Sequence, residues 1–371
     1  MRVLALASYP VEAAATRFRL EQFVKPLAAR GIELNIRPFM ETELFRSLYR
    51  HQSLAANAVG LLKATLKRLT DLPAIRKADV VLIQREAMIM GPPVLEWAAK
   101  RIFRRPIVLD LDDATYVAYT SPTYGALGKS LKWFSKTDDL IRWADVVMCG
   151  NRGIADYVTS QGSKARLLPT VVDPDVFRPQ ANRNSPPVIG WIGTHSTFPY
   201  LKTIFPVLTS LAQRFEFRLR VVGAGCDVTV PGVEVENLTW DLGREVQDFQ
   251  SIDIGVYPID ASLYGGGWAQ GKSGFKAIQY LAVGVPYVAT PVGGSAEIGE
   301  DGVTHFFASS PDEWHRTLGI LLSDKNKRLE MGRRGREHAL EHYSLEAQAD
   351  VLAAALTECA QHSVDIGRAA R

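Results

Sequence analysis

Short β-rich runs alternate with longer stretches of helical period along the whole sequence. This alternation predicts an α/β fold in which parallel sheets carry helices on both faces. In the first half, the predicted strands are RVLALAS (2–8), IELNIRP (32–38), DVVLIQR (79–85), PIVLDL (106–111) and DVVMCG (145–150). In the second half, they are PVIGWIG (187–193), FRLRVVG (217–223), IDIGVYP (252–258), VPYVAT (285–290) and THFFAS (304–309).

The two series of strands are separated by VDPDVFRPQANRNSPP (172–187), which is rich in Pro, Asn, Asp and Ser and poor in apolar residues. Such a composition is typical of a linker between domains. A chain of 371 residues is also too long for one ordinary core. We therefore expect two doubly wound domains, 1–180 and 181–345. A helical segment, 346–371, is predicted to follow and to pack back toward the first domain.

Charge is unevenly distributed, although the net charge is only +3. Through residue 180 there are 26 Lys and Arg against 18 Asp and Glu. The basic N-terminal half of the chain could bind an anionic membrane surface or a phosphorylated ligand. Alternatively, its charges lie on solvated helix faces. Two segments, 53–70 and 128–136, mix apolar residues with lysines and so suggest peripheral membrane contact. Packing of the first segment against the core is the alternative.

The three cysteines lie far apart, without the spacing of metal ligands. They indicate buried thiols in a reducing compartment, and so a cytoplasmic protein. No apolar segment reaches the length of a membrane span.

The stretch GFKAIQYLAVGVPYVATPVGG (274–294) places a helix, a buried strand and two adjacent glycines in immediate succession. Ser273 is predicted to cap the helix, Gly284 to end it and Pro286 to prevent its continuation. The free N–H groups of that helix, with Lys272 and Lys276 nearby, make an anion site that suits a diphosphate.

These motifs resemble the retaining glycosyltransferases of family 4, which have the two-domain GT-B fold. The resemblance covers most of the chain and is strongest over 187–310. It is carried by GKSGFKAIQYLAVGVPYVATPVGGSAEIGEDG (271–302), by IGWIGTHSTFPYLK (189–202) and by LLPTVVDPDVFRP (167–179). It implies two Rossmann-like domains facing a cleft, with an acceptor side in the first and a nucleotide-sugar site in the second.

For the donor site, the resemblance implies contacts from Thr194, His195, Gly271, Ser273, Lys276, Gln279, Gly293, Gly294 and Glu297. Lys202 and Lys272 are the expected catalytic cations at the donor phosphates. Two positions depart from the family: Gln279 stands where a glutamate binds the ribose, and Gly271 where a carboxylate contacts the sugar. Gln279 can still offer an acceptor and a donor to ribose hydroxyls. Without the family's carboxylate at position 271, the protein could use a different donor sugar or be an inactive member of the family.

On the acceptor side, Asp112 occupies the place of a family histidine at the end of the fourth strand, with Asp113 beside it. We expect Asp112 to be catalytic and Asp113 to line the acceptor site, while pairing with Arg85 is the structural alternative. Asp110 is expected to be structural. Arg17 and Arg19 follow the first strand and could face an anionic acceptor, or be surface charges.

The sequence thus predicts a hexosyltransferase that retains anomeric configuration and acts in polysaccharide or glycoconjugate biosynthesis. The acceptor would be a glycan, lipid-linked or small-molecule hydroxyl. We expect no metal or other cofactor and no nucleic-acid partner, and location in the cytoplasm at the inner face of the membrane. Two alternatives remain open, a degenerate GT-B scaffold subunit and a sugar-nucleotide epimerase. A nicotinamide dehydrogenase is disfavoured because SYPVEAAATRF, after the first strand, lacks the glycine-rich dinucleotide turn.

Overall fold

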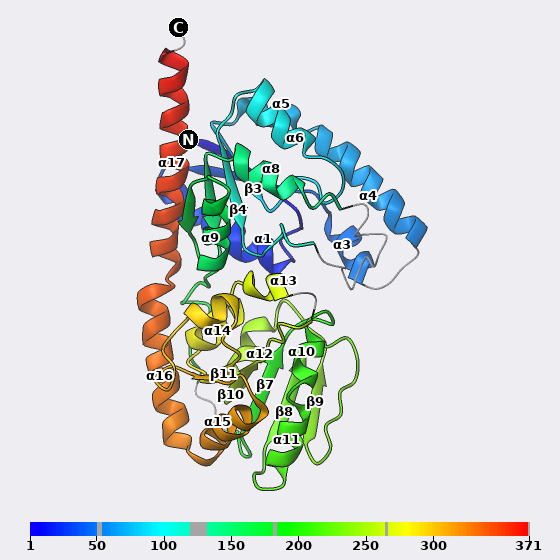
Figure 1. Cartoon of the computed structure of the whole chain (residues 1–371), viewed down its shortest axis with the longest axis vertical. Coiled ribbons are helices and arrows are strands. Elements are labelled where there is room, and N and C mark those ends of the chain that lie inside the picture. The colour runs from blue at the N-terminus through cyan, green and yellow to red at the C-terminus, as the bar shows by residue number, and fades with distance from the viewer. Residues whose placement is uncertain (50–53, 119–131, 181–183, 264–265, 370–371) are drawn as a thin grey trace. The chain divides into compact units, whose positions relative to one another are not determined.

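The structure is a computed structural model that describes residues 1–49, 54–118, 132–180, 184–263 and 266–369 (Figure 1). The chain forms two compact units. The first unit comprises Met1–Thr170 together with Leu345–Arg371, and the second comprises Val171–Ser344.

The first unit is built on a six-stranded parallel sheet in the order β2-β1-β3-β4-β5-β6. Its strands are β1 (Arg2–Ala7), β2 (Glu33–Pro38), β3 (Val80–Gln84), β4 (Ile107–Leu111), β5 (Val146–Cys149) and β6 (Ala165–Leu167). The chain moves outward from β1 to β2 and then returns to β3 on the other side of β1. The carboxyl ends of β1 and β3 are therefore the topological switch point, where α/β sheets bind ligands.

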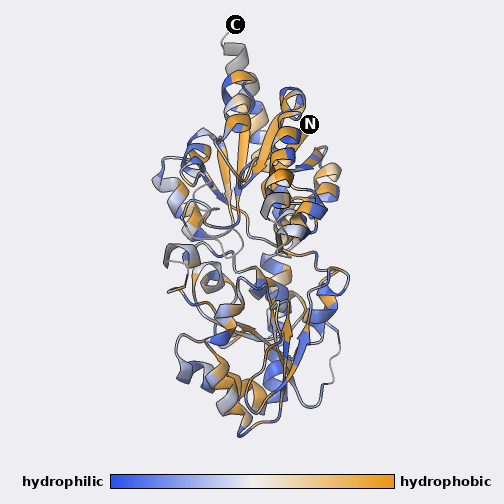
Figure 2. Ribbon diagram, turned by 90° about the vertical axis from the view of Figure 1, so that its right-hand side faces the viewer, coloured by the Kyte–Doolittle hydropathy of each residue, from blue (hydrophilic) through white to orange (hydrophobic). Residues whose placement is uncertain are grey.

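Helices cover this sheet, and its central strands are buried along their whole length. The helices are α1 (Ala14–Arg19), η1 (Glu21–Phe23), α2 (Val24–Ala29), α3 (Thr42–Tyr49), α4 (Leu54–Leu69), α5 (Leu72–Lys77), α6 (Val94–Trp97), η2 (Ala98–Ile102), α8 (Lys136–Trp143), α9 (Arg152–Ser160) and α17 (Leu345–Ala369). Figure 2 shows the strands of this sheet in the orange of apolar residues. Burial on both faces explains why these strands are almost continuously apolar.

The second unit repeats the plan, with a parallel sheet in the order β12-β11-β10-β7-β8-β9. Its strands are β7 (Val188–Ile192), β8 (Arg218–Val222), β9 (Glu234–Leu238), β10 (Ile254–Tyr257), β11 (Tyr287–Ala289) and β12 (Phe306–Phe307). Its helices are α10 (Phe198–Lys202), α11 (Phe205–Ala212), α12 (Glu245–Gln250), α13 (Gly266–Gln270), α14 (Phe275–Ala282), η3 (Gly293–Glu297), α15 (Pro311–Ser323) and α16 (Lys325–His342). The switch point here lies between β7 and β10.

All ten predicted strands are present, which confirms the two series. The prediction missed β6 and β9, which are edge strands. β9 has the sequence EVENL and is only half-buried, because one of its edges has no neighbouring strand. A short polar edge strand lacks the continuous apolar run that marks a central one.

The first segment of the first unit ends at Thr170, whereas the sequence predicted a domain boundary at residue 180. The segment after Thr170 belongs to the second unit because of specific contacts. The Phe177 ring packs edge-on against Phe249, with centroids 6.2 Å apart. The Arg336 guanidinium donates to the carbonyl oxygens of Pro174 at 2.9 Å and of Phe177 at 2.7 Å.

Helix α17 belongs to the first unit, so the chain crosses between the two units twice. Arg30, at the end of α2, donates to Asp350 at 2.7 Å and to Glu346 at 3.0 Å. Arg166 of β6 donates to Glu358 at 2.8 Å. These contacts bind α17 to elements far away in the sequence.

Candidate functional site

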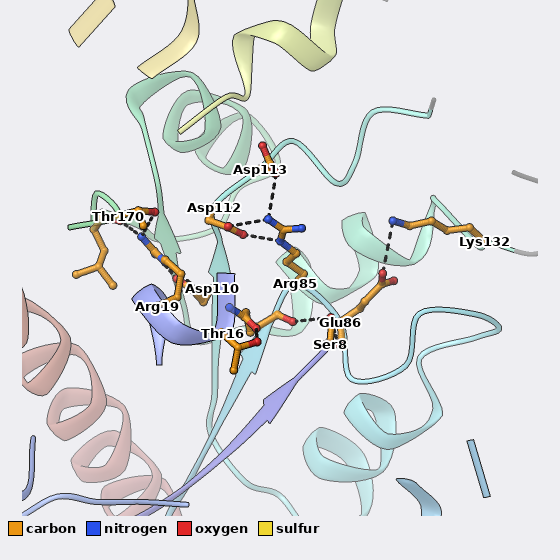
Figure 3. Close-up of polar contacts among 12 residues, drawn as sticks. Ser8, Thr16, Arg19, Arg85, Glu86, Asp110, Asp112, Asp113, Lys132 and Thr170 are labelled. Atoms are coloured by element: carbon orange, nitrogen blue, oxygen red, sulfur yellow. Dashed lines mark hydrogen bonds and ion pairs between the residues drawn. The ribbon is translucent and has the colours of Figure 1, made fainter. Parts of the chain in front are cut away.

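Polar side chains gather at the carboxyl ends of β1, β3 and β4, which is the switch point of the first sheet (Figure 3). Each strand is apolar until its end and is followed by charged or hydroxyl residues: Ser8 after β1, Arg85 and Glu86 after β3, and Asp112 and Asp113 after β4. Because neighbouring parallel strands end at the same edge, these residues meet in space.

Arg19 forms a buried ion pair with Asp110, the fourth residue of β4. The Nε of Arg19 donates to Oδ2 at 3.0 Å, and its Nη2 donates to Oδ1. Its Nη1 donates to the hydroxyl of Thr170 at 3.3 Å and to the carbonyl of Leu168. Burial alone would lower the pKa of Arg19, but the Asp110 carboxylate outweighs it and raises the pKa.

The expectation that Arg19 faces an acceptor or lies on the surface is therefore wrong. Its side chain is 1% exposed, and its donors are used inside the unit. The structural role expected for Asp110 is confirmed by the same contacts.

Arg17 is half-buried. Its Nη1 donates to the Glu12 carbonyl at 3.0 Å, and its guanidinium lies 4.6 Å from the Phe18 ring centroid.

Arg85 directly follows β3 in a left-handed conformation, with φ of 60°, which is uncommon for a residue that is not glycine. The surrounding structure fixes this turn. The backbone N–H of Arg85 donates to the Asp110 carbonyl at 2.8 Å. The Ser8 hydroxyl lies within donating distance of the carbonyls of Gln84, at 3.2 Å, and Glu86, at 2.9 Å. Strained backbone that is held in this way is typical of functional sites.

The turn aims the Arg85 guanidinium at two carboxylates. It donates to both oxygens of Asp112, at 2.5 and 2.7 Å, and to Oδ2 of Asp113, at 3.0 Å. Burial alone would raise the pKa of Asp112, but the charge and hydrogen bonds of Arg85 outweigh it and lower the pKa. Asp112 is therefore an ionised acceptor of hydrogen bonds and is not suited to act as a general acid. The pairing with Arg85 that the sequence offered as an alternative is present.

Glu86 extends this polar edge. Its carboxylate pairs with the Nζ of Lys136 at 2.7 Å and with that of Lys132 at 3.5 Å. The Lys136 side chain is 2% exposed and also donates to the Met88 carbonyl at 2.6 Å. Sequence reasoning missed this group, although the polar pair Arg85-Glu86 after an apolar strand is the same signal that marked Asp112 and Asp113.

In the second unit, β7 ends at a tight turn that leads into α10. The N–H of Thr194 donates to the Thr197 hydroxyl at 3.1 Å, and the hydroxyls of Thr194 and Ser196 are 2.8 Å apart. Gly193 must be glycine because an added Cβ would lie 2.2 Å from the Trp191 ring. The turn therefore presents Thr194, half-buried His195 and Ser196 beyond the strand end.

Lys202 occupies the last turn of the five-residue helix α10 and is exposed. Its Nζ lies 4.8 Å from the Phe198 ring centroid. The helix begins after Thr197, which is its N-cap by position but makes no side-chain capping bond.

The loop before α14 is packed directly against the loop after β11. The N–H of Gly294 donates to the Lys272 carbonyl at 2.7 Å. A Cβ on Gly274 would lie 2.6 Å from the Gly294 carbonyl carbon, and a Cβ on Gly293 would lie 2.7 Å from the Ala269 carbonyl oxygen. The glycines of these two loops therefore allow the loops to contact each other.

The helix begins one residue later than predicted. Its N-cap is Gly274, with φ of 68°, and not Ser273. Glycine is needed here because the left-handed conformation and the close approach of Gly294 both disfavour a side chain. Glu297, which was predicted to contact the donor, ends the 3-10 helix η3 and is exposed.

Lys272 and Lys276 lie on either side of the beginning of α14 and are both half-buried. The Nζ of Lys272 lies 4.8 Å from the Trp268 ring centroid, and that of Lys276 lies 5.5 Å from the Tyr257 ring centroid. Gly271 is buried just before this group. The predicted cations and the helix N-terminus are therefore brought together in the folded unit.

Gln279 is 3% exposed. No group of three or more metal-ligating side chains lies together within the described ranges.

No helix among the described residues is long and apolar enough to cross a bilayer. Of the two lysine-bearing segments, residues 128–131 lie outside the described part of the chain.

Residues 186–324 match the family model described as Glycosyl transferases group 1. This match falls on the second unit and contains both of its loops. No curated protein matches the chain.

Several solved structures are similar over nearly the whole chain. HepE (Alr3699) of Anabaena, in complex with UDP and glucose, is 15% identical, with a TM-score of 0.66 over 96% of this chain and 100% of that one. A glycosyltransferase of Rickettsia africae ESF-5 is 13% identical, with a TM-score of 0.69 over 96% and 98%. Sucrose-phosphate synthase of Thermosynechococcus elongatus is 13% identical, with a TM-score of 0.65 over 100% of both chains. The predicted GT-B fold is thereby confirmed.

Proposed function

We propose that this protein is a retaining glycosyltransferase that moves a hexose-type unit from a nucleotide sugar to an acceptor hydroxyl in polysaccharide or glycoconjugate biosynthesis. The match to group 1 glycosyltransferases over the second unit supports the reaction class. HepE has been solved with UDP-glucose as well as with UDP, which favours a uridine nucleotide as the donor to test first.

One observation carries the proposal: the contact between the Lys272–Gly274 loop and Gly293-Gly294, at the N-terminus of α14 and beside Lys276. Breaking the bond to the donor diphosphate builds negative charge on the leaving oxygen. We propose that the positive end of the α14 dipole, together with Lys272 and Lys276, stabilises that charge. We assign Lys202, Thr194 and His195 to the same phosphates.

Gln279 is the proposed ribose contact. Its side chain is 3% exposed and offers a carbonyl acceptor and an amide donor, which suit two ribose hydroxyls. The backbone at Gly271 then lies toward the sugar, where the family has a carboxylate. Glu297 is placed with the donor sugar by family resemblance.

In the first unit, we assign the acceptor to the polar edge that carries Asp112 and Asp113. A carboxylate kept ionised by Arg85 can accept hydrogen bonds from acceptor hydroxyls. The departing phosphate takes the acceptor proton on the same face of the sugar, so no protein nucleophile is required. We further propose that no metal or other cofactor is needed, because the cations of the second unit stabilise the leaving group.

The test is a two-step assay with UDP-, GDP- and ADP-sugars. A cognate donor should raise the melting temperature by mass action. With an added acceptor, nucleoside diphosphate release should follow glycoside formation in a one-to-one ratio, with retained anomeric configuration by NMR and undiminished rate in EDTA. Binding without any turnover would support the scaffold alternative, which the departures at Gly271 and Gln279 motivate. Interconversion of donor epimers without an acceptor would support the epimerase.

A further inference from the structure

The helix α4 turns a line of apolar side chains away from the first unit. Val59, Leu62, Leu66 and Leu69 are 53%, 60%, 58% and 40% exposed. Their spacing of three, four and three residues places them on one face of the helix. Figure 1 shows α4 at the outside of the unit, away from the strands of its sheet. We call these four residues the α4 stripe.

The other face of α4 holds the helix on the unit. Ala64 and Arg68 are buried, and the Arg68 guanidinium donates to the carbonyls of Ala87 at 2.9 Å and Ala7 at 2.6 Å. The sequence allowed these leucines to pack against the core. The structure shows that Leu61 packs against the core beside Ala64 and Arg68, whereas Leu62, Leu66 and Leu69 face outward.

The exposed charges of this region are all positive. Within residues 54–77 they are Lys63 and Lys67 on α4 and Arg76 and Lys77 on α5. The one carboxylate in this range, Asp71, is 8% exposed and pairs with Arg68 at 3.0 Å. The lysines of α4 therefore alternate with its leucines, without any exposed acid on the helix.

A neighbouring acid does reach this surface. Glu41, before α3, pairs with Lys67 at 2.5 Å, and both side chains are about two-thirds exposed. Exposed ion pairs of this kind contribute little to stability, so Lys67 can exchange Glu41 for another anion. Lys63, Arg76 and Lys77 are also exposed, so the region remains cationic.

We propose that the α4 stripe and the cations around it bind an anionic lipid bilayer, with α4 lying in the plane of the head groups. Apolar side chains would enter the boundary of the acyl chains, while the long lysine side chains extend to the lipid phosphates. An apolar partner protein would not require Lys63 and Lys67 among the leucines of the stripe, whereas an anionic lipid surface attracts both. The inference is independent of the sugar chemistry proposed above.

The experiment is co-sedimentation of the full chain with two kinds of vesicle, phosphatidylcholine alone and equal parts of phosphatidylcholine and phosphatidylglycerol. We expect binding to the anionic vesicles that weakens as NaCl is raised. Lys63→Gln with Lys67→Gln should weaken partitioning about 25-fold, since each lysine near an anionic surface is worth about fivefold. Leu62→Ser with Leu66→Ser should weaken it by more than about tenfold.

Matched controls separate this surface from general effects. Leu329→Ser removes a leucine that is 61% exposed on α16, and Lys25→Gln with Lys325→Gln removes two exposed lysines elsewhere. Both controls should bind as the wild type does, and circular dichroism should show that every variant is folded. Absence of wild-type binding to anionic vesicles at low salt overturns the proposal, as does wild-type binding by the double serine variant. A dimer seen by light scattering that the serine variant dissociates, without vesicle binding, would instead identify a self-association face.

Discussion

Arg85 holds both carboxylate oxygens of Asp112, at 2.5 and 2.7 Å, from a backbone position with φ of 60°. The turn that produces this contact joins the end of β3 to the end of β4 across 27 residues of sequence. The contact therefore depends on a conformation that arginine adopts only when its surroundings impose it.

Replacing Arg85 tests that strain. Arg85→Gly and Arg85→Ala both remove the guanidinium, but glycine adopts positive φ without cost, whereas alanine loses about 1 kcal/mol or more. Arg85→Gly should therefore be at least as stable as Arg85→Ala in urea unfolding. If Arg85→Gly were instead less stable than Arg85→Ala by roughly 0.5–1 kcal/mol, which is the usual cost of glycine in ordinary backbone, the turn would not be strained.

In the transfer assay, Arg85→Lys should lower turnover more than donor binding, because an ammonium cannot hold two oxygens at once.

The buried pair of Arg19 and Asp110 should be a major contributor to stability. Arg19→Ala leaves an unpaired carboxylate in the interior, so the free energy of unfolding should fall by about 3–5 kcal/mol. The control is Arg30→Ala, which breaks the exposed pairs with Glu346 and Asp350 and should cost about 1 kcal/mol or less. Equal losses in chemical denaturation would contradict a structural role for Arg19.

Gly274 should be the most sensitive glycine of the donor loops. Gly274→Ala places a Cβ 2.6 Å from the Gly294 carbonyl carbon at a φ of 68°. Gly302→Ala is the matched control, because its φ is 76° but nothing lies within 4 Å of the new Cβ. Gly302→Ala should lower the free energy of unfolding by about 1 kcal/mol, because only the left-handed backbone opposes the new side chain. Gly274→Ala should cost clearly more and weaken donor binding, and melting curves with and without donor measure both effects.

Lys272 and Lys276 should matter for the rate more than for the fold. Lys272→Ala and Lys276→Ala should each lower turnover roughly a hundredfold or more, as the loss of one preorganised donor typically does. Circular dichroism checks the fold, and Lys325→Ala, at an exposed site on α16, is the control. If both variants kept the wild-type rate, the assignment of the phosphate site would be wrong.

His305 should make the second unit less stable in acid. Its ring is 0% exposed and stacks on Tyr287 with centroids 4.7 Å apart, and burial lowers its pKa from 6.5 to about 4. Between these two values the unfolded chain binds a proton that the folded chain excludes. Stability should therefore fall as the pH drops from about 6.5 to about 4, by up to about 3 kcal/mol in all. His305→Phe should flatten this part of the profile, and His362→Gln, at an exposed site, should leave it unchanged.

Much of the donor region could be predicted from the sequence. The glycines at 274, 293 and 294, the lysines at 272 and 276 and the buried Gln279 are all local features of one stretch of chain. The local pattern could not predict that the glycines bring the two loops into contact. That contact depends on the packing of α13 against η3, which are separate elements of the chain. The same holds for the cap, because whether Ser273 or Gly274 begins the helix depends on the nearness of Gly294.

By itself, the sequence determined the two parallel sheets and most of their strands, because burial on both faces leaves a continuous apolar run that can be recognised in the chain. Only the tertiary structure decided which charges are partners and which faces are free. Arg19 and Asp110 are 91 residues apart, and the leucines of α4 fit an inward or an outward face equally well by period. Those choices depend on which elements are neighbours in space, and periodicity along one element carries no information about its neighbours.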